Sequence, residues 1–241
     1  MSAGAALAVV IPVRNEAQHL PMLLADLALA PAGLVAERVV VDGGSVDGTA
    51  ALAQLAGATV LHGPANRGWQ LQRGIAATSA PWLLLLHGDG RLPADWAAVV
   101  QRALRQPPAA WYFDLAVAGG GAPLKLLEAA VALRCRLRQL PYGDQGLLLP
   151  RALLERAGGV RPLPLMEDLD LVQRLKPLAP LRRLGRPLRV DGRRWRRHGA
   201  WLGVLRVAWR NAQLRRDWRR GISAEQLAAR YYGLRSCGPS R

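Results

Sequence analysis

Apolar and amphipathic segments alternate along the first half of the chain. Residues 7–13 form a continuous apolar run, which is typical of a strand buried on both faces of a sheet. Residues 16–30 then carry leucines at the spacing of one helix face. The alternation continues with predicted strands at 38–41, 58–61 and 82–86 and predicted helices at 49–56, 68–78 and 94–104, the last with Pro93 at its first helical position. This order predicts right-handed βαβ units and a mostly parallel sheet.

The second half of the chain has a less regular pattern. Ser223, with Gln226 three residues later, forms a capping box for a helix at 223–232. No segment is long enough to be a linker between two domains, so the 241 residues are expected to form a single α/β domain with a helical C-terminal tail. The other elements predicted here are strands at 111–117 and 147–149 and helices at 124–140, 151–157, 166–175 and 201–218.

Three polar clusters each follow a predicted strand directly. They are residues 14–16 (RNE), 42–45 (DGGS) and 87–89 (HGD). In parallel sheets, ligands bind beyond the carboxyl ends of the strands, so we expect these clusters to share one edge of the sheet.

Several familiar nucleotide and hydrolase signatures are absent from this edge. Residues 12–16 (PVRNE) stand where a dinucleotide-binding fold has its glycine-rich turn, which disfavours a dehydrogenase. The sequence also has no Walker lysine motif and no Gly-x-Ser-x-Gly elbow, which argues against P-loop phosphoryl transfer and α/β-hydrolase chemistry. The remaining candidate chemistry uses acids, glycines and arginines.

The charge of the chain is strongly positive and unevenly spread. The net charge is +16, and residues 181–220 contain fourteen arginines against two acids, Asp191 and Asp217. Such a segment attracts polyanions, whether nucleic acid, anionic lipid headgroups or phosphorylated substrates. A general preference for arginine with a solvated helix face would produce the same charge, since the only lysines are Lys125 and Lys176.

The cysteines and the first residues bear on the compartment. Cys135 and Cys237 have no paired spacing, so they predict neither a disulfide nor a zinc site and fit a reducing environment. Residues 1–13 lack the basic start of a signal peptide, and the longest apolar run nearby, 82–86, is too short to cross a bilayer. A cytoplasmic protein is expected.

Five motifs, in this order along the chain, resemble the family 2 glycosyltransferases. They are 10–16 (VIPVRNE), 41–49 (VDGGSVDGT), 87–89 (HGD, in place of an Asp-x-Asp metal motif), 166–168 (MED, like a Glu-Asp catalytic motif) and 191–195 (DGRRW, similar to the Gln-x-x-Arg-Trp element of processive members). Residues 66–71 (NRGWQL) and 142–145 (YGDQ) look closer to a small bacterial subgroup, the arsenosugar-biosynthesis-type glycosyltransferases. The resemblance spans about residues 8–232.

This resemblance implies a GT-A fold that transfers a sugar, with inversion, from a nucleotide-diphosphate donor to a hydroxyl acceptor. It assigns residues 1–110 to nucleotide-sugar binding, 111–198 to the acceptor and catalysis, and 199–241 to a basic helical tail. Pro12, Glu16 and Asp42 are expected to line the nucleotide pocket, with Arg67 near the base or diphosphate. Asp42 is also suited to a turn, and Arg67 to solvent.

A divalent cation is the expected cofactor, because a departing diphosphate needs positive charge. Mn²⁺ or Mg²⁺ takes hard oxygen ligands and is often held by one or two carboxylates together with substrate phosphates. Asp89 is the expected carboxylate ligand. His87 stands where relatives carry an acid, and it either binds the metal, which would favour manganese, or forms a hydrogen bond to the ribose or a neighbouring loop.

An acidic group at the start of the helix predicted for 166–175 is the candidate for proton transfer. Repulsion among Glu167, Asp168 and Asp170 should raise at least one pKa, although acids also stabilise a helix N-terminus. By resemblance, Asp168 is the base that deprotonates the acceptor hydroxyl. The residues expected to contact the acceptor are Asp144, Gln145, Glu167, Arg194 and Trp195, the last by stacking on a sugar ring.

Two other functions compete with glycosyl transfer. The charge alone would suit a nucleic-acid-binding protein, but the sequence has no zinc-finger, RNP or helix-turn-helix signature, so no specific nucleic acid is expected. A nucleotidyltransferase of similar architecture usually opens with a glycine-rich basic loop, which 12–16 is not. The expected partners are the donor and a small or lipid-linked acceptor. Trp201, Trp209 and Trp218 in the basic tail leave open a peripheral contact with an anionic membrane.

Overall fold

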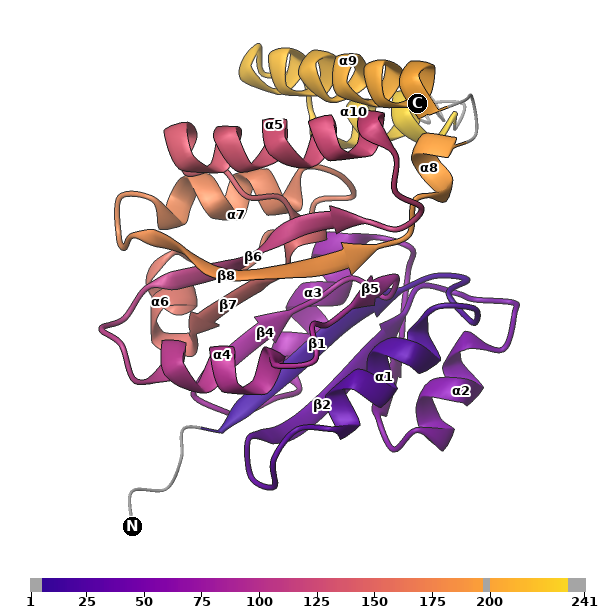
Figure 1. Cartoon of the computed structure of the whole chain (residues 1–241). Helices are drawn as coiled ribbons and strands as arrows, with labels where there is room; N and C mark the ends of the chain where they lie inside the picture. The colour runs from indigo at the N-terminus through magenta and orange to yellow at the C-terminus, as the bar shows by residue number, and fades with distance from the viewer. Residues whose placement is uncertain (1–5, 197–199, 234–241) are drawn as a thin grey trace, which may run out of the picture.

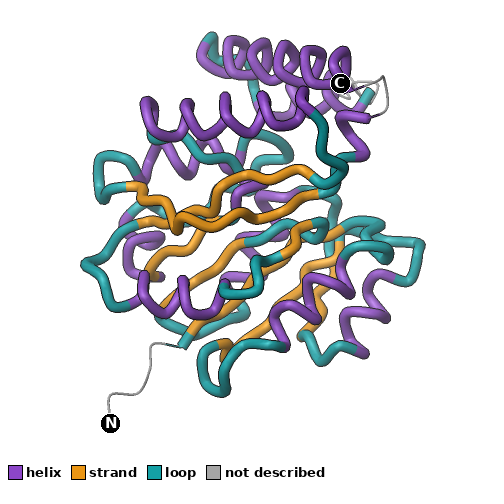
Figure 2. The backbone as a smooth tube through the Cα atoms, in the orientation of Figure 1, coloured by secondary structure: helices purple, strands orange, loops and turns teal. Residues whose placement is uncertain are grey.

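A central sheet organises the molecule, and its strand order explains the alternation in the sequence. The computed structural model describes residues 6–196 and 200–233, although not the side chains of Arg194, Arg196 and Ala200. Within them, eight strands pair in the order β3-β2-β1-β4-β7-β6-β8-β5, with helices on both faces (Figures 1 and 2). The strands are β1 (Leu7–Val13), β2 (Val35–Asp42), β3 (Thr59–His62), β4 (Trp82–Leu85), β5 (Gly90–Arg91), β6 (Ala110–Val117), β7 (Leu147–Pro150) and β8 (Leu181–Val190).

The sheet is parallel on one side and mixed on the other. Strands β3, β2, β1 and β4 run parallel to one another, as βαβ units require. Strand β7 then runs antiparallel to both β4 and β6, whereas β6 and β8 are parallel. This curled, mostly parallel sheet confirms the α/β prediction.

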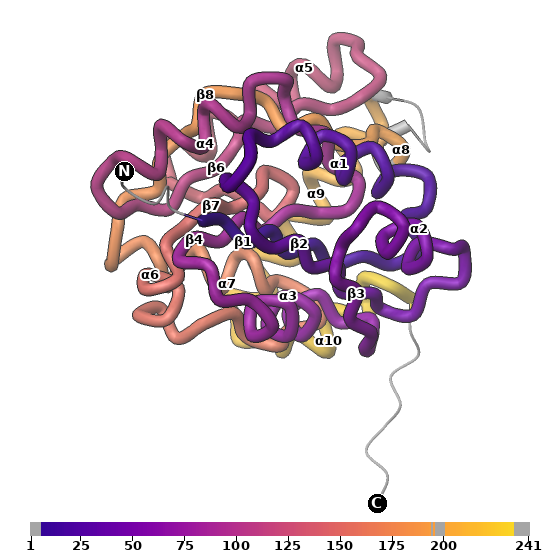
Figure 3. Tube along the Cα trace, turned by 90° about the horizontal axis from the view of Figure 1, so that it is seen from below, coloured from indigo at the N-terminus to yellow at the C-terminus, as the bar shows by residue number. Residues whose placement is uncertain are grey.

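Two separate hydrophobic cores lie against the two faces of the sheet. Residues of β1 alternate between them: Leu7, Val9 and Ile11 pack with α1 and α4, while Ala8 and Val10 pack toward α3. Figure 3 shows the strands between α1 and α4 on one side and α3, α7 and α10 on the other. Both faces of β1 are buried, so its sequence is apolar throughout.

The helices cover these faces and add a further layer. Helices α5, α6 and α7 join α3 on one face, and α9 and α10 lie outside them (Figure 1). The helices are α1 (Leu20–Ala28), α2 (Thr49–Leu55), α3 (Arg67–Ala76), α4 (Trp96–Leu104), α5 (Ala122–Arg138), α6 (Arg151–Arg156), α7 (Glu167–Leu175), α8 (Arg193–Arg196), α9 (Ala200–Arg219) and α10 (Ala224–Tyr232), with a 3-10 turn at Gly143–Gln145. As expected, Ser223 caps α10 by accepting the N–H of Gln226.

Pro12 ends the pairing between the two central parallel strands. The β1–β4 ladder runs from the Leu7–Trp82 pair to the Val10–Leu85 pair. Pro12 lies two residues beyond Val10 and has no N–H with which to extend the ladder. The strands therefore separate here, where the polar residues after β4 begin.

The side-chain amide of Gln70 joins the ends of β1 and β2. Gln70 is buried in α3, and its Nε2 donates to the carbonyl oxygens of Val13 (3.0 Å) and Val41 (2.7 Å). Both carbonyls lie where the strands give way to polar loops. The loops are joined in turn, because Asn15 accepts from the N–H of Val46 and its own N–H donates to Ser45.

Several predicted boundaries differ from the structure for local reasons. Helix α1 begins at Leu20 rather than at 16, because Asn15 is left-handed (φ 55°) and the N–H groups of Glu16 and Ala17 donate to the next loop. Helix α4 begins at Trp96, so Pro93 precedes it instead of opening it. The other ends agree with the prediction to within three residues.

The largest error of the sequence prediction is β8, a ten-residue strand in a segment taken for part of an arginine-rich run. Its buried positions, Leu181, Leu188 and Val190, are separated by exposed arginines and by a left-handed Gly185 (φ 72°). Arg183 forms a bidentate ion pair with Asp114 of β6, in which Nε and Nη2 each donate to one carboxylate oxygen at 2.8 Å. Part of the arginine-rich segment 181–220 therefore belongs to the sheet.

We expect Gln70→Leu to lower the free energy of unfolding by about 1–3 kcal/mol, because it removes a donor from two strand-end carbonyls. Gln72→Leu is the matched control, since Gln72 lies on the same helix and is exposed. Urea denaturation measures both variants. Equal midpoints for the two variants would show that the amide bridge contributes nothing.

Candidate active site

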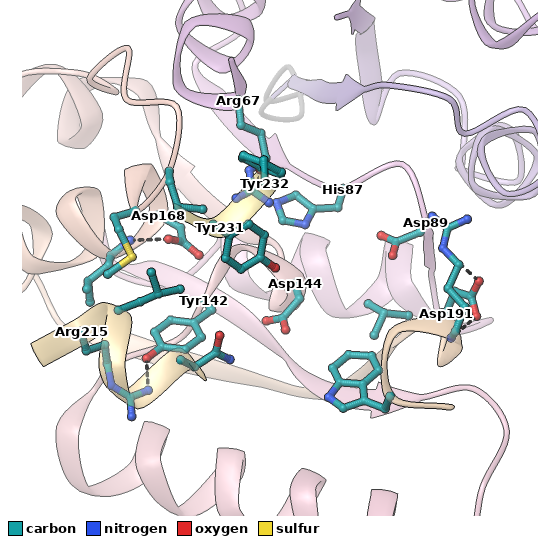
Figure 4. A pocket seen from close by; sticks show the side chains of 18 residues that line it. Arg67, His87, Asp89, Tyr142, Asp144, Asp168, Asp191, Arg215, Tyr231 and Tyr232 are labelled. Carbon is teal, nitrogen blue, oxygen red and sulfur yellow. Dashed lines mark hydrogen bonds and ion pairs between the residues drawn. The ribbon is translucent and has the colours of Figure 1, made fainter. Parts of the chain in front are cut away.

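A cavity of about 240 Å³ lies beyond the carboxyl end of β4. Its walls come from elements far apart in the sequence, and its lining is strongly charged (Figure 4). The residues that line it are Arg67, His87, Asp89, Tyr142, Asp144, Leu165, Met166, Asp168, Leu169, Val190, Asp191, Arg193, Trp195, Asn211, Leu214, Arg215, Tyr231 and Tyr232.

Three carboxylates predicted from the sequence reach this one cavity. Asp89 follows β4, Asp144 lies in the 3-10 turn before β7, and Asp168 lies in the first turn of α7. Figure 4 shows them entering from different sides, with the ring of His87 between Asp89 and Asp168. The structure thus brings together the expected metal-binding and proton-transfer groups.

Backbone geometry holds Asp168 in place. Met166, immediately before α7, has a left-handed conformation (φ 69°) that turns the chain into the helix. The carboxylate accepts the N–H of Gly143 at Oδ2 (2.8 Å) and that of Leu169 at Oδ1 (2.7 Å). Each oxygen retains a lone pair, so Asp168 can still accept another proton or hydrogen bond.

Gly143 permits the close approach of His87 and Asp168. A Cβ atom on this glycine would lie 2.6 Å from His87 Nε2 and 3.4 Å from Asp168 Oδ2. The first distance is a clash between non-bonded atoms. The turn at Gly143 therefore determines how closely His87 approaches the carboxylate.

Arg67 and Glu167 form an ion pair beneath the cavity. Arg67 Nε lies 2.5 Å from Glu167 Oε1, and the Glu167 side chain is 1% exposed. Burial raises the pKa of the Glu167 carboxyl; Arg67 opposes this shift and the neighbouring Asp168 adds to it. The predicted rise in an acidic pKa thus falls on Glu167, mainly through burial. Glu167 does not line the cavity, whereas Arg67 does.

A second charged network borders the cavity beside Asp89. His19 contacts Glu16 through Nδ1 (3.0 Å) and Asp191 through Nε2 (2.9 Å), and Arg193 binds Glu16 (2.7 Å). Burial raises the pKa of Glu16, the charge of Asp89 contributes in the same direction, and Arg193 opposes both. Glu16 is therefore close to the metal candidate but engaged with protein partners.

Pro12 and Asp42, the other expected nucleotide-side residues, lie outside the cavity lining. Pro12 is buried within β1. Asp42 is 2% exposed and accepts both the backbone N–H and the hydroxyl of Ser45, with His62 Nδ1 at 3.6 Å. The turn interpretation of Asp42 is thus realised in the structure.

The expected acceptor residues have different positions. Asp144 and Trp195 line the cavity, although Trp195 is only 5% exposed. Gln145 is buried away from it: its Nε2 donates to Phe113, and its Oε1 accepts from Arg134 and Tyr142. Gln145 therefore supports the turn that carries Asp144 instead of lining the cavity. The side chain of Arg194 lies outside the described residues.

The roof of the cavity was not anticipated from the sequence. Asn211, Leu214 and Arg215 of α9 and Tyr231 and Tyr232 of α10 line it. Arg215 Nη1 donates to the hydroxyl of Tyr142 (2.6 Å), which connects the roof to the turn at 143–145. The buried and half-buried positions of α9 recur every three or four residues. This helical period was the sequence signal that one side of α9 packs against the rest of the protein.

The donor set fits a divalent cation that is completed by its substrate. In the described part of the chain, no three His, Cys, Asp or Glu side chains are grouped so that they could hold a metal by themselves. Asp89 offers a hard oxygen ligand in a cavity that also contains His87, and Mg²⁺ or Mn²⁺ is commonly bound by one or two carboxylates plus phosphates. The residues present therefore fit such an ion only together with a phosphorylated ligand.

An α/β sheet with an acid-lined cavity at the carboxyl ends of its strands is the arrangement of GT-A nucleotide-sugar transferases. Residues 8–127 match the family model described as glycosyl transferase family 2. Over these residues the chain belongs to that family.

Curated relatives agree with this assignment over part of their length. The chain is 38% identical over 93 residues to an uncharacterised glycosyltransferase of Mycobacterium tuberculosis (strain ATCC 25618 / H37Rv). It is 37% identical over 114 residues to a TPR repeat-containing protein of Synechococcus elongatus. The matches span 38% and 45% of this chain but only 40% and 27% of the respective relatives.

Solved structures share the fold. One is glucosyl-3-phosphoglycerate synthase from Mycobacterium tuberculosis in complex with Mn²⁺, UDP and phosphoglyceric acid, with a TM-score of 0.58 and 24% identity. The match covers 83% of this chain and 75% of that one. The same enzyme with Mg²⁺ and UDP has a TM-score of 0.58 and 24% identity, over 83% of this chain and 76% of that one.

We expect Arg67→Met to lower the free energy of unfolding by about 3 kcal/mol, the lower end for a broken buried pair, since Arg67 is one-third exposed. The cause is the buried Glu167 carboxylate left without its partner. The double variant Arg67→Met/Glu167→Leu should recover most of this loss, as measured by urea denaturation. If the double variant instead loses the sum of what Arg67→Met and Glu167→Leu lose separately in free energy of unfolding, the pair has no coupling energy.

Proposed function

We propose that the protein is an inverting, metal-assisted glycosyltransferase that moves a sugar from a nucleotide-diphosphate donor to a hydroxyl acceptor. The observation that carries this proposal is the convergence of Asp89, Asp144 and Asp168 on one cavity next to the family-matched sheet edge. The Mn²⁺, UDP and phosphoglyceric acid of the structural neighbour support a nucleotide donor and a small acceptor. The likeness to arsenosugar-biosynthesis-type enzymes remains part of the proposal.

Asp168 acts as the general base. Its carboxylate faces the cavity and is held by two backbone N–H groups, so it has a fixed position toward a bound acceptor (Figure 4). As the acceptor oxygen attacks the sugar carbon, the hydroxyl proton passes to Asp168 and the bond between that carbon and the diphosphate oxygen breaks. Asp144 and Trp195 orient the acceptor, and Gln145 and Glu167 act from beneath through Tyr142 and Arg67.

Asp89 holds the divalent cation, and His87 either joins it or orients the donor. When bound, Mn²⁺ or Mg²⁺ neutralises charge on the departing diphosphate as a Lewis acid. Pro12, Glu16 and Asp42 shape the nucleotide side of the site, with Arg67 toward the diphosphate. The assignment of 1–110 to the donor and 111–198 to the acceptor, with a role for Arg194, belongs to the same proposal, as does a cytoplasmic location.

We expect Asp168→Asn to reduce turnover by about 10²–10⁴-fold, because it removes the general base. Donor and Mn²⁺ binding should be nearly unchanged. Asp170→Asn is the control two residues away: Asp170 pairs with Arg161 and Arg174, so this change should affect stability more than turnover. Transfer activity above about one-third of the wild type in Asp168→Asn would exclude its role as the base.

We expect nucleotide binding to require a divalent cation and to be lost in Asp89→Ala. A thermal-shift panel of UDP, GDP, ADP, CMP and TDP compounds, with and without Mn²⁺, measures this, since a ligand at about 100 times its Kd adds about 2.7 kcal/mol of stability. His87→Asp should move the preference from Mn²⁺ toward Mg²⁺ if His87 is a ligand. Shifts that persist with chelator would refute the metal role.

A further inference from the structure

Helix α9 has two faces, and one of them has no partner within the described residues. On the inner side, positions 204, 207, 211, 214 and 218 recur every three or four residues and are buried or half-buried. Asn211 and Leu214 on this side form part of the cavity roof. The opposite side is exposed, as expected for an outer helix of the layered fold (Figure 1).

The outer face of α9 carries large apolar side chains on its first half. Trp201, Leu202, Leu205 and Trp209 are between 57% and 69% exposed, and three of them enclose a shallow depression with Arg206. Clustered exposed side chains of this size, unlike scattered ones, mark an interaction surface. None of the helices in the described ranges is both long and apolar enough to cross a bilayer.

The second half of the same face is positively charged. The stripe that begins with Trp201, Leu205 and Trp209 continues about two and three turns later as Arg216 and Arg219, with Arg206 at its flank. These arginines are exposed and have no ion pair with another described residue. Asp217, the only acid in α9, is turned away and lies 3.5 Å from Arg230.

From this arrangement, we infer that the outer face of α9 binds an anionic phospholipid surface. The tryptophans and leucines enter the headgroup region, and the arginines contact lipid phosphates, as in helices that lie in a membrane interface. A second copy of the chain fits this face less well. Pairing two outer faces would bring the arginines of both copies together with no acidic side chain on either face to balance them. This inference does not depend on the proposed function, since lipid binding needs no nucleotide sugar.

Docking on this face would bring the catalytic cavity to the membrane. The roof residues Asn211 and Leu214 are on the same helix as the outer stripe but on its opposite side, and a helix with its side chains is about 10–12 Å across. An acceptor held in the lipid surface would then need to extend only past α9 and α10 to reach the cavity.

The experiment is sedimentation of the full chain with vesicles of phosphatidylcholine alone and of phosphatidylcholine with phosphatidylglycerol at 3:1. We expect binding to the anionic vesicles at low salt, a blue shift of tryptophan emission, and negligible binding to neutral vesicles. Binding should disappear toward molar salt, where the screening length is about 3 Å. Absence of binding to anionic vesicles at low salt overturns the inference.

Variants assign the binding to α9. Arg206→Gln/Arg216→Gln/Arg219→Gln should weaken the partition coefficient about 100-fold, since each basic residue near an anionic surface contributes about fivefold. Leu202→Ser/Leu205→Ser keeps Trp201 and Trp209, whose fluorescence reports on binding, and should abolish the blue shift of the tryptophan emission. The matched controls, far from α9, are Arg73→Gln/Arg102→Gln/Arg105→Gln for charge and Leu29→Ser/Leu55→Ser for exposed leucine.

Two outcomes contradict the assignment. If the control variants weaken vesicle binding as much as the α9 variants, the binding is caused by the net charge of +16 and not by the outer face of α9. If light scattering shows a dimer that Leu202→Ser/Leu205→Ser dissociates, the face is an interface between two copies. Unfolding midpoints equal to the wild type establish that the variants remain folded.

Discussion

The site depends on how the ends of β1 and β2 are held together. Gln70 donates to the carbonyl oxygens of Val13, at the end of β1, and of Val41, one residue before the end of β2. Gly43 leaves space for this amide, because a Cβ atom on it would lie 3.0 Å from Gln70 Nε2. From that junction the polar loops diverge, and Pro12 stops β1 from pairing further with β4. The edge of the sheet therefore opens where Asp89 follows.

The sequence anticipated those parts of the structure in which local pattern and tertiary role agree. Strand β1 is apolar because two cores cover it, and the polar turns after β1, β2 and β4 meet because parallel strands end at one edge. Strand β8 escaped prediction because its arginines satisfy partners on neighbouring elements, as Arg183 does with Asp114. The roof escaped because Trp201, Leu205 and Trp209 make the outer side of α9 as apolar as its inner side, so the helical period alone did not indicate which side meets the cavity.

The arginines of this segment have several distinct roles, and charge alone would have suggested nucleic acid. Arg183 and Arg186 join β8 to its neighbours, Arg193 balances Glu16 and Asp191 beside the cavity, and Arg215 holds Tyr142. Arginine suits these tasks because its planar group makes paired hydrogen bonds and stacks on rings, as Arg134 does on Tyr142 (3.7 Å to the centroid). Net charge is therefore a poor guide to function here.

The roof has a consequence for how the molecule folds. The floor of the cavity is set by Asp89 and its neighbours, whereas Tyr231 and Tyr232 close it from more than a hundred residues later in the chain. Contacts of such sequence separation form late, because loop-closure entropy must be overcome before they stabilise the structure. During synthesis, residues 8–127 can form their parallel strands before α9 and α10 cover the cavity. The cavity therefore has its roof only once α9 and α10 have packed onto the sheet.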